Sequence, residues 1–359
     1  MKKMMTAAAV LFASTVFAQD SAKQTTNPLT FSGYAEGYYS YDFNEPSNNS
    51  KPGFSYNHNG HNEFEVNLAF VRGTYSGDKV RGTVAIGVGT YMNANYAAEP
   101  ATLKNIYEAN AGVKIGNKNL WFDIGILPSH IGFESAVSKD CWTLTRSLLA
   151  ENTPFFQGGA RLNYTSDDGK LFLSGLLLNG WQRIARVEAN SLMSFGTQFT
   201  YKPSTTVTIN YSTFIGTDKP DSARLNRVYH NIYGIFQVSK QFGITAGFDI
   251  GTEQKTKGSS THNTVYSPVL IAKYSIDDKW AIAARGEYYS DENGMLISTG
   301  TPNGFKTASF SLNLDYAPAS NVLVRFEGRT LNSKDKIFIK DVNAKKDDNF
   351  FTTSVAISF

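Results

Sequence analysis

The 359-residue chain has a single cysteine, Cys141, and this scarcity excludes several classes of protein. An internal disulfide needs two cysteines, and a zinc–thiolate centre needs several. Charged residues are also few, at 18% of the sequence against about 25% in ordinary soluble domains. Their signs nearly balance, with 34 Lys and Arg against 31 Asp and Glu. A nucleic-acid partner requires a basic surface and is therefore not expected.

Long hydrophobic runs are missing as well, except at the start of the chain. Residues 1–18, MKKMMTAAAVLFASTVFA, combine two lysines, an apolar stretch and a small-residue cleavage pattern that ends at Ala18. This combination predicts a secretory signal peptide, because its apolar part is shorter than the about 20 residues that a membrane helix needs. The sequence thus predicts an exported chain with a short periplasmic tail, residues 19–28.

What the sequence has instead is alternation of apolar and polar residues, which predicts half-buried strands. The segment 308–316, ASFSLNLDY, shows it clearly. So does the segment 62–70, NEFEVNLAF, which places all four of its large apolar residues on one face: Phe64, Val66, Leu68 and Phe70. About sixteen such segments run from Leu29–Asp42 to Asn349–Phe359, an even number of the kind found in single-chain outer-membrane barrels.

The connections between these segments alternate between short turns and long polar loops. The long loops are expected at 43–61, 93–104, 129–153, 183–190, 218–226, 253–262, 291–304 and 333–348. Tight periplasmic turns and long outer loops are typical of a transmembrane β-barrel. The fold class that we predict for residues 29–359 is therefore all-β: an antiparallel up-and-down barrel of about 16 strands.

Aromatic residues recur beside the short turns and are expected to form a belt at the membrane interface. The predicted belt consists of Tyr164, Phe172, Tyr201, Phe242, Tyr274, Trp280, Tyr316 and Phe359. The alternative is that aromatic rings simply pack well on sheets. Tyr75 and Trp121 are out of phase with the apolar face of their strands, which would require a β-bulge.

The polar face of the strands carries too many ionisable groups for a packed core. The predicted wall residues are Arg81, Asp123, Arg161, Arg285, Glu287, Asp315, Arg325, Glu327 and Arg329. Burying such groups without partners would cost several kcal/mol each. This face is therefore expected to line water, and the apolar face to contact lipid. Because about sixteen strands enclose a lumen too wide for wall side chains to fill, we predict a channel.

The third long loop contains the one helix that the strand-rich part of the chain is expected to have. From Cys141 the sequence CWTLTRSLLAEN places Trp142, Thr145, Leu148 and Leu149 at helical spacing. Pro154 then ends the helix, since proline lacks the N–H and clashes with the preceding turn. The apolar stripe is expected to lean on the inner wall of the barrel.

The segment 123–164, DIGILPSHIGFESAVSKDCWTLTRSLLAENTPFFQGGARLNY, contains a Gly-Phe-Glu triplet at 132–134, Pro154 and a Gly-Ala-Arg triplet at 159–161. With these features it resembles the OmpL-like β-barrel outer-membrane porin family. In that family a strand ending in Gly-x-x-x-x-x-x-Gly-Phe-Glu leads to a helical segment, a proline and a Gly-x-Arg strand. The matching residues are Gly125, Gly132, Phe133, Glu134, Pro154, Gly159 and Arg161. The terminal FTTSVAISF, closing on Phe359, resembles the last strand that outer-membrane assembly machinery recognises. The resemblance implies a pore-forming protein in the outer membrane of a Gram-negative bacterium.

The expected function is a porin: a water-filled channel for small hydrophilic solutes and ions, without cofactor or enzyme activity. Sixteen-stranded porins fold their third loop into the lumen, and fixed charges there set ion preference. The expected constriction residues are Glu134, Lys139, Asp140, Arg146 and Glu151, presented to water. A loop that plugs the barrel or lies across its mouth is the alternative.

Three other functions compete with that of a porin. An outer-membrane hydrolase is not favoured, because the sequence contains no nucleophile-elbow motif. A metal site formed by His58, His61 and Glu63 is not favoured either, because these residues lie on an expected outer loop. A TonB-coupled importer would need about twenty-two strands and an N-terminal plug. The sequence predicts about sixteen strands and only a short tail at 19–28, so this class is not expected. A non-transport barrel that serves as an assembly partner or scaffold stays open.

Ion selectivity is predicted to be weak. A basic ladder is expected on the late strands opposite the third loop, at Arg285, Arg325 and Arg329. Glu287, Asp315 and Glu327 alternate with these arginines and are expected to neutralise them. The sequence leaves the transported solute open, and it neither requires nor excludes a homo-oligomer.

Overall fold

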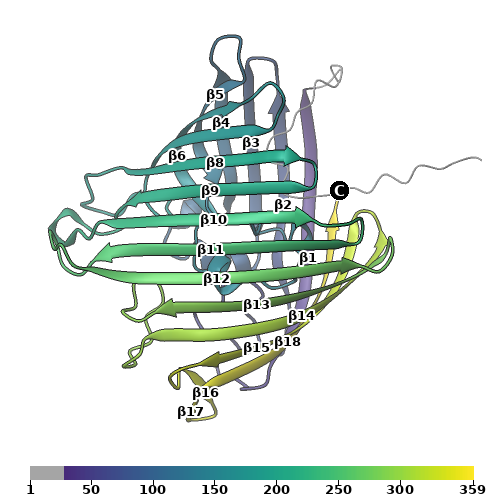
Figure 1. Cartoon of the computed structure of the whole chain (residues 1–359), viewed down its shortest axis with the longest axis vertical. Helices are drawn as coiled ribbons and strands as arrows, with labels where there is room; N and C mark the ends of the chain where they lie inside the picture. Colours follow the sequence, from purple (N-terminus) through teal and green to yellow (C-terminus); the bar gives the residue numbers. More distant parts are fainter. Residues whose placement is uncertain (1–27) are drawn as a thin grey trace, which may run out of the picture.

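The computed structural model describes residues 28–359, which form a closed antiparallel barrel of sixteen strands (Figure 1). The predicted signal peptide and residues 19–27 of the predicted tail lie outside the described residues. Neighbouring strands in the sequence pair with one another, and β1 pairs with β18 to close the sheet. The predicted fold class is confirmed.

The strands that form the barrel are 8 to 15 residues long. They are β1 (Leu29–Asp42), β2 (Phe64–Ser76), β3 (Val80–Val88), β4 (Ile106–Lys114), β5 (Leu120–Pro128), β6 (Phe156–Thr165), β7 (Leu171–Leu178), β8 (Ser194–Ser204), β9 (Val207–Gly216), β10 (Arg227–Gln237), β11 (Phe242–Gln254), β12 (His262–Ser275), β13 (Trp280–Asp291), β14 (Phe305–Ala319), β15 (Val322–Ser333) and β18 (Asp347–Ser358). A separate small hairpin consists of β16 (Phe338–Lys340) and β17 (Asn343–Lys345).

Short turns join the strands at one end of the barrel and long loops join them at the other, on the left in Figure 1. We name the long loops L1 (43–63), L2 (89–105), L3 (129–155), L4 (179–193), L5 (217–226), L6 (255–261), L7 (292–304) and L8 (334–346). The helices are short and all lie in these loops: α1 (Thr90–Asn95), α2 (Leu148–Glu151), η1 (Ala101–Leu103), η2 (Ser138–Asp140) and η3 (Asp221–Ala223). Within residues 28–359, no helix has the length and apolar character needed to cross a membrane.

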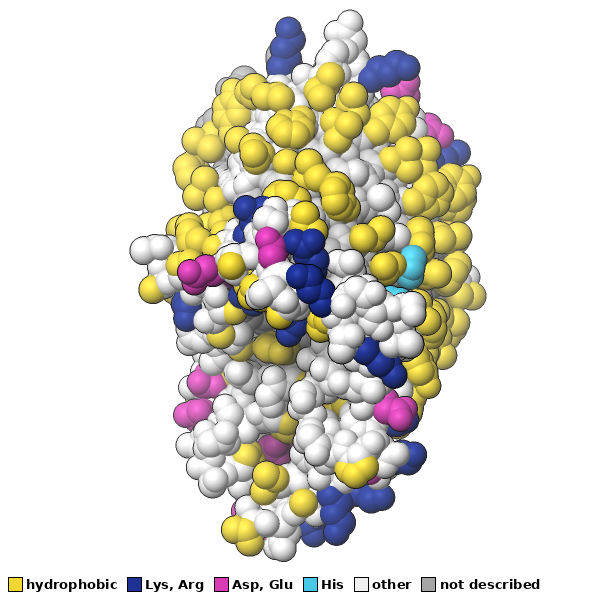
Figure 2. Space-filling view, turned by 90° about the vertical axis from the view of Figure 1, so that its left-hand side faces the viewer, with side chains coloured by type: hydrophobic (Ala, Val, Ile, Leu, Met, Phe, Trp, Pro, Cys, Tyr) yellow, Lys and Arg dark blue, Asp and Glu magenta, His cyan; other side chains and the backbone are white. Residues whose placement is uncertain are grey.

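The two faces of the strands differ as the alternation predicts. On β14 the side chains of Phe310 and Leu312 are exposed on the outside, whereas Ser311 and Asn313 are buried inside. In the view onto the loop-bearing end, hydrophobic side chains cover the flank of the barrel and charged side chains gather on the loops (Figure 2). The outer apolar band fits lipid, and the closed sheet leaves no unpaired edge within it.

Strand β2 departs from simple alternation because it contains a β-bulge. Gly37 pairs with Val66 and Glu36 with Leu68, so Asn67 has no partner of its own on β1. The extra residue shifts the phase: Phe64 and Val66 are exposed, but Leu68 and Phe70 are buried inside. The expectation that all four share one face is therefore wrong. The same shift brings Tyr75 to the outer face, where it is exposed.

The predicted aromatic belt has one member on the wrong face. Phe172 alternates with outward Leu173 and shares its face with Ser174, whose hydroxyl bonds the inward side chain of Asn163. Phe172 therefore points into the barrel. The other seven residues lie on the outer face beside the short turns or at the C-terminus: Tyr164, Tyr201, Phe242, Tyr274, Trp280, Tyr316 and Phe359. Trp121 also points inward, 4.3 Å from the Arg81 guanidinium, with no bulge involved.

Candidate functional site

Loop L3 lies inside the barrel, because it bonds to strands on opposite sides of it. The ring of His130 contacts the Thr213 carbonyl of β9 at 2.8 Å, and the Gly132 N–H donates to Asn231 of β10. Further along, Ser138 donates to Glu36 of β1, and the Leu144 N–H donates to Asn313 of β14 at 3.0 Å. A segment that reaches β1, β9, β10 and β14 of a closed barrel must cross its lumen.

Three arginines of β13 and β15 bind the backbone of L3. Arg285 donates to the Thr145 carbonyl at 2.6 Å, Arg325 to the Ser138 carbonyl at 2.5 Å, and Arg329 to the Arg146 carbonyl at 2.9 Å. All three side chains are at most 3% exposed. Together with Glu287 and Glu327 they form what we call the clamp.

The carboxylates of the clamp hold the N–H groups of the same stretch. Glu327 accepts from the Thr145 N–H at 2.6 Å, and Glu287 accepts from the Leu148 N–H at 2.6 Å. Each carboxylate is also paired with an arginine, Glu327 with Arg285 and Glu287 with Arg329. The charges are therefore buried, paired and hydrogen-bonded, which is how a low-dielectric interior tolerates them.

The clamp explains why the predicted helix is mostly absent. Only residues 148–151 are helical, capped by the Ser147 hydroxyl, which accepts from the Ala150 N–H at 3.2 Å. In residues 141–147 the backbone groups of Leu144 and Thr145 bond to barrel side chains and are not available to a helix. The expectation of a single helix is also wrong, since α1 lies in L2.

The five predicted constriction residues divide into two groups. Lys139 and Asp140 are half-buried, and the Lys139 ammonium donates to Ser358 at 3.1 Å. Burial raises the pKa of Asp140. Arg146 is fully buried and donates to the carbonyls of Ser135, Ala136 and Leu144, so it closes L3 on itself. The expectation that Arg146 faces water is wrong, because its guanidinium has carbonyl partners within its own loop.

Glu134 and Glu151 are the other buried members. The Glu134 carboxylate accepts from the N–H and hydroxyl of Ser147, and burial raises its pKa. Glu151 accepts from the Tyr56 N–H at 2.8 Å and from the Asn57 side chain at 3.1 Å, so it connects L3 to L1. Burial raises the pKa of Glu151 to about 7. Glu151 therefore does not present a charge to open water as expected.

The predicted wall residues of the early strands meet in a second cluster. Arg81 of β3 holds Asp123 of β5 through two hydrogen bonds of 2.6 and 2.8 Å, and the Arg161 Nε of β6 donates to the same carboxylate at 3.2 Å. Asp315 of β14 pairs with Arg325 at 2.8 Å and belongs to the opposite wall. All nine predicted wall residues lie on the inner face, in these two groups.

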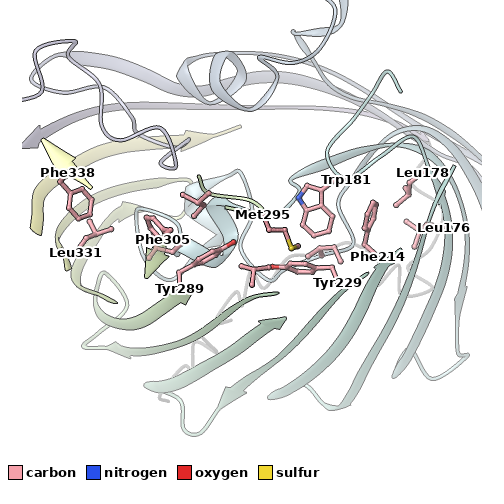
Figure 3. Close-up of a cluster of buried hydrophobic side chains, with 14 of the residues drawn as sticks. Leu176, Leu178, Trp181, Phe214, Tyr229, Tyr289, Met295, Phe305, Leu331 and Phe338 are labelled. Atoms are coloured by element: carbon pink, nitrogen blue, oxygen red, sulfur yellow. The ribbon is translucent and has the colours of Figure 1, made fainter. Parts of the chain in front are cut away.

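Apolar packing fills part of the lumen near the loops. Trp181 of L4 packs edge-on against Phe214 and Tyr229 of the inner wall, at ring distances of 4.9 and 4.6 Å. Met295 of L7 and Phe338 of β16 join the same layer (Figure 3). From the sequence we expected water along this whole face. The apolar layer was not predicted, because an alternating strand has the same sequence pattern whether water or a loop covers its inner side.

Loop L1 also enters the lumen, which the sequence did not indicate. His58, assigned to an outer loop, is buried, and its Nε2 lies 3.2 Å from Glu36 of β1. The Lys51 ammonium donates to Thr352 of β18 at 3.2 Å, and burial lowers the pKa of Lys51 to about 8. His61 accepts from the Asp42 N–H. Among residues 28–359, no three His, Cys, Asp or Glu side chains are grouped to hold a metal.

Solved barrels share this architecture. The outer membrane channel DcaP of Acinetobacter baumannii matches with a TM-score of 0.61 at 12% identity, over 92% of this chain and 97% of that chain. The anion-selective porin from Comamonas acidovorans matches with a TM-score of 0.60 at 8% identity, over 92% and 99%. OmpT of Vibrio cholerae in its trimer form matches with a TM-score of 0.59 at 13% identity, over 92% and 99%. Identities this low establish the fold alone.

Sequence comparison is more specific. No curated protein matches the chain. The model of the family described as "Putative beta-barrel porin-2, OmpL-like" matches residues 28–359, which is the whole described barrel. With the closed sixteen-stranded sheet, its apolar outer band and the polar inner face, the chain therefore belongs to the OmpL-like family of outer-membrane β-barrel porins.

Proposed function

We propose that the protein is a narrow porin-type channel in the outer membrane of a Gram-negative bacterium, passing small hydrophilic solutes and ions by diffusion. The observation that supports this most is the closed barrel, whose inner face carries polar side chains on every strand and charged clusters on opposite walls. The DcaP channel and the anion-selective porin have the same fold. The barrel has no proposed enzymatic role, since its charged clusters bind one another and the loops.

In this proposal L3 sets the width of the channel. The clamp holds L3 against β13–β15, so solutes pass between L3 and the opposite wall, β2–β6. Lys139 and Asp140 of η2 keep partial solvent contact and are the proposed constriction charges of the loop. Because L1, L4 and L7 also occupy the lumen near the mouth, we expect a small conductance and a low size limit for sugars.

Single-channel recording and liposome swelling test this function. The wild-type protein should give steady, small conductance steps and admit only the smallest sugars. Deleting residues 135–146 should raise the conductance several-fold, because the lumen loses the segment that crosses it. Shortening L6, residues 255–261, is the matched control: L6 lies between β11 and β12, and its Lys257 contacts L5. That control should leave conductance unchanged.

The buried state of L1 and L3 also favours a second candidate, a closed barrel that acts as a scaffold or assembly partner. The same recordings separate the two. A wild-type protein without conductance, which becomes conductive only on deletion of residues 135–146, would support the closed barrel. Steady conductance of the wild-type protein would exclude the closed barrel.

We further propose that Phe359 ends a strand recognised by the outer-membrane assembly machinery. Its ring is 70% exposed and covers Gly33 of β1, at the seam where the barrel closes. Replacing Phe359 with Ala should lower the fraction of protein assembled in outer membranes, while refolding in detergent continues. Equal loss in both assays would contradict a role in recognition. The trimer form of the OmpT neighbour makes a homo-oligomer a reasonable proposal here, which chemical cross-linking in membranes tests.

A further inference from the structure

Charged side chains of the inner wall differ in how much water they reach. On β13–β15 the arginines and carboxylates of the clamp are at most 3% exposed. On β2, β3 and β6 the side chains of Arg72, Arg81 and Arg161 keep 30%, 20% and 11% of their exposure. Their carboxylate partners, Glu108 and Asp123, keep 12% and 2%. The charge that water meets on this wall is therefore mainly positive.

We propose that Arg72, Arg81 and Arg161 form an anion-binding subsite that gives the channel a preference for small anions, inorganic or carboxylate-bearing. This inference rests on the proposed channel function and adds the class of solute. It places selectivity on β2–β6, whereas the sequence predicted a basic ladder on β13 and β15 that neighbouring carboxylates neutralise.

The lower level of the subsite is nearer to the short turns. Asp123 is bound by both Arg81 and Arg161 and by the Asn163 amide at 2.5 Å, so its oxygens are occupied. Two guanidinium groups bind this one carboxylate and are more exposed than it is, so the exposed charge of these three side chains is positive. The ring of Trp121 lies 4.3 Å from the Arg81 guanidinium and supports its face, an arrangement that holds a cation in place.

The upper level is nearer to the loops. Arg72 pairs with Glu108 at 3.2 Å and lies over the rings of Phe70 and Tyr107, at 4.8 and 5.8 Å. The Arg72 Nε is shielded from solvent and finds no hydrogen-bond acceptor among residues 28–359. Four residues of β4 separate Glu108 from Gly112, which lies beneath Asp123, so the two levels are about 13 Å apart along the strand.

Other charges of the inner wall and of L3 add to this field or oppose it. Lys114 of β4 and Lys202 of β8 are half-buried on the inner face toward the short turns and add positive charge. From L3, Asp140 opposes Arg72, but it is adjacent to Lys139 in the sequence. Arginine is suited to the proposed ligands, because its planar N–H groups match carboxylates and similar anions.

A salt gradient across a planar bilayer measures the preference. A unit charge about 8 Å away in water enriches anions about twofold and depletes cations about twofold, so we expect the chloride-to-potassium permeability ratio to be about 4 in dilute salt. The ratio should approach 1 in molar salt, where charges are screened within about 3 Å. Replacing all three arginines with Gln should abolish the preference, and R72Q alone should reduce it by about half.

Two controls separate charge from structure. R72K keeps the charge and should keep the preference. R186Q removes an arginine from L4, outside the inner wall, and should change nothing. A conducting wild-type channel without anion preference, or a triple variant that retains it, would overturn the subsite and leave the channel function standing.

Fluorescence quenching tests for the anion site even if the protein does not conduct. Iodide quenches tryptophan fluorescence, and the part of the quenching lost in W121F reports the anion near Arg81. We expect that part to exceed quenching by caesium and to fall at least twofold in R81Q. Absence of conductance with this signal present would reject the channel and keep the anion site. Absence of the signal would reject the site.

Discussion

The walls formed by β13–β15 and by β2–β6 contain the same types of charged residue and use them differently. On β13–β15, Arg285, Arg329, Glu287 and Glu327 hold the backbone of L3 and lose contact with water. On β2–β6, Arg72 and Arg81 pair with carboxylates and stay 30% and 20% exposed. The difference lies in what covers the side chains. An inward arginine on a barrel strand can therefore be buried in contacts that hold a loop, or it can stay in contact with solvent.

The largest expected effect comes from breaking the clamp. Arg285→Ala leaves Glu287 and Glu327 buried with one partner fewer, which should lower stability by about 3–5 kcal/mol. Cleavage of L3 by protease and thermal unfolding in detergent measure the change. Lys170→Ala, on a short turn, is the matched control, and its pair with Asp168 is solvent-exposed. A clamp variant as stable as this control would contradict the structural role of the β13–β15 wall.

Two glycines, one on β5 and one on β13, differ in the space that surrounds them. Gly125 of β5 has a φ of +134°, and a Cβ there would collide with the Ala109 carbonyl of β4. Gly125→Ala should lower stability by about 2–4 kcal/mol through strain and overpacking together.

The control is Gly286→Ala on the outer face of β13, where a Cβ would have no protein atom within 4 Å among residues 28–359. It should be neutral. Equilibrium unfolding in lipid measures the stability of both variants. Similar losses of stability would show that the space around these two glycines does not matter.

Protonation of Glu151 should control how firmly L1 binds L3. Its pKa is raised from 4.5 to about 7, so its contribution is full below about pH 4.5 and is lost as pH rises through about 7. Between pH 6 and pH 8 the equilibrium constant for binding of L1 to L3 should fall about tenfold. Arg146 and Arg329 face the same carboxylate and do not titrate in this range.

Hydrogen-exchange protection of the Tyr56 and Asn57 amides, which donate to Glu151, measures this change. Glu151→Gln keeps an acceptor oxygen and should remove the pH dependence. A dependence that persists in this variant would assign the effect to another group.

The smallest expected effect concerns the outer face. Trp280 and Tyr316 pair beside a short turn, with ring centroids 4.5 Å apart. Trp280→Ala should lower stability by about 1 kcal/mol, and Trp280→Phe by less, because a ring pair is retained. Unfolding in lipid bilayers measures both. Equal losses would indicate that burial in the interface, and not the ring pair, accounts for the residue.

Much of the barrel could be predicted from particular segments. The predicted first strand, Leu29–Asp42, has the bounds of β1, and the predicted third loop, 129–153, differs from L3 by two residues. Strand β2 shows the limit. A bulge at Asn67 changes which residues face inward, and nothing in NEFEVNLAF marks the residue where pairing slips.

The candidate site was less accessible to sequence reasoning. The wall residues were identified because period-two alternation assigns a face to each position. Arg72 was missed because the β2 bulge changes the face on which it lies. Lys51 was missed and His58 was assigned to solvent because their loop has the polar composition of a solvated one. Whether Arg146 or Glu151 meets water depends on contacts with residues far away in the chain.

The alternation and the rhythm of turns and loops in the sequence were enough to determine the barrel and its orientation toward lipid, because a closed sheet satisfies every backbone group locally between neighbours. Only the tertiary structure decided that Leu144 and Thr145 bond to barrel side chains and not within a helix. It also decided which arginines are buried under L3 and which stay partly exposed. The reason is physical: strand pairing is a contact between neighbours in the sequence, whereas the fit of a loop into a lumen depends on side chains contributed from all around it.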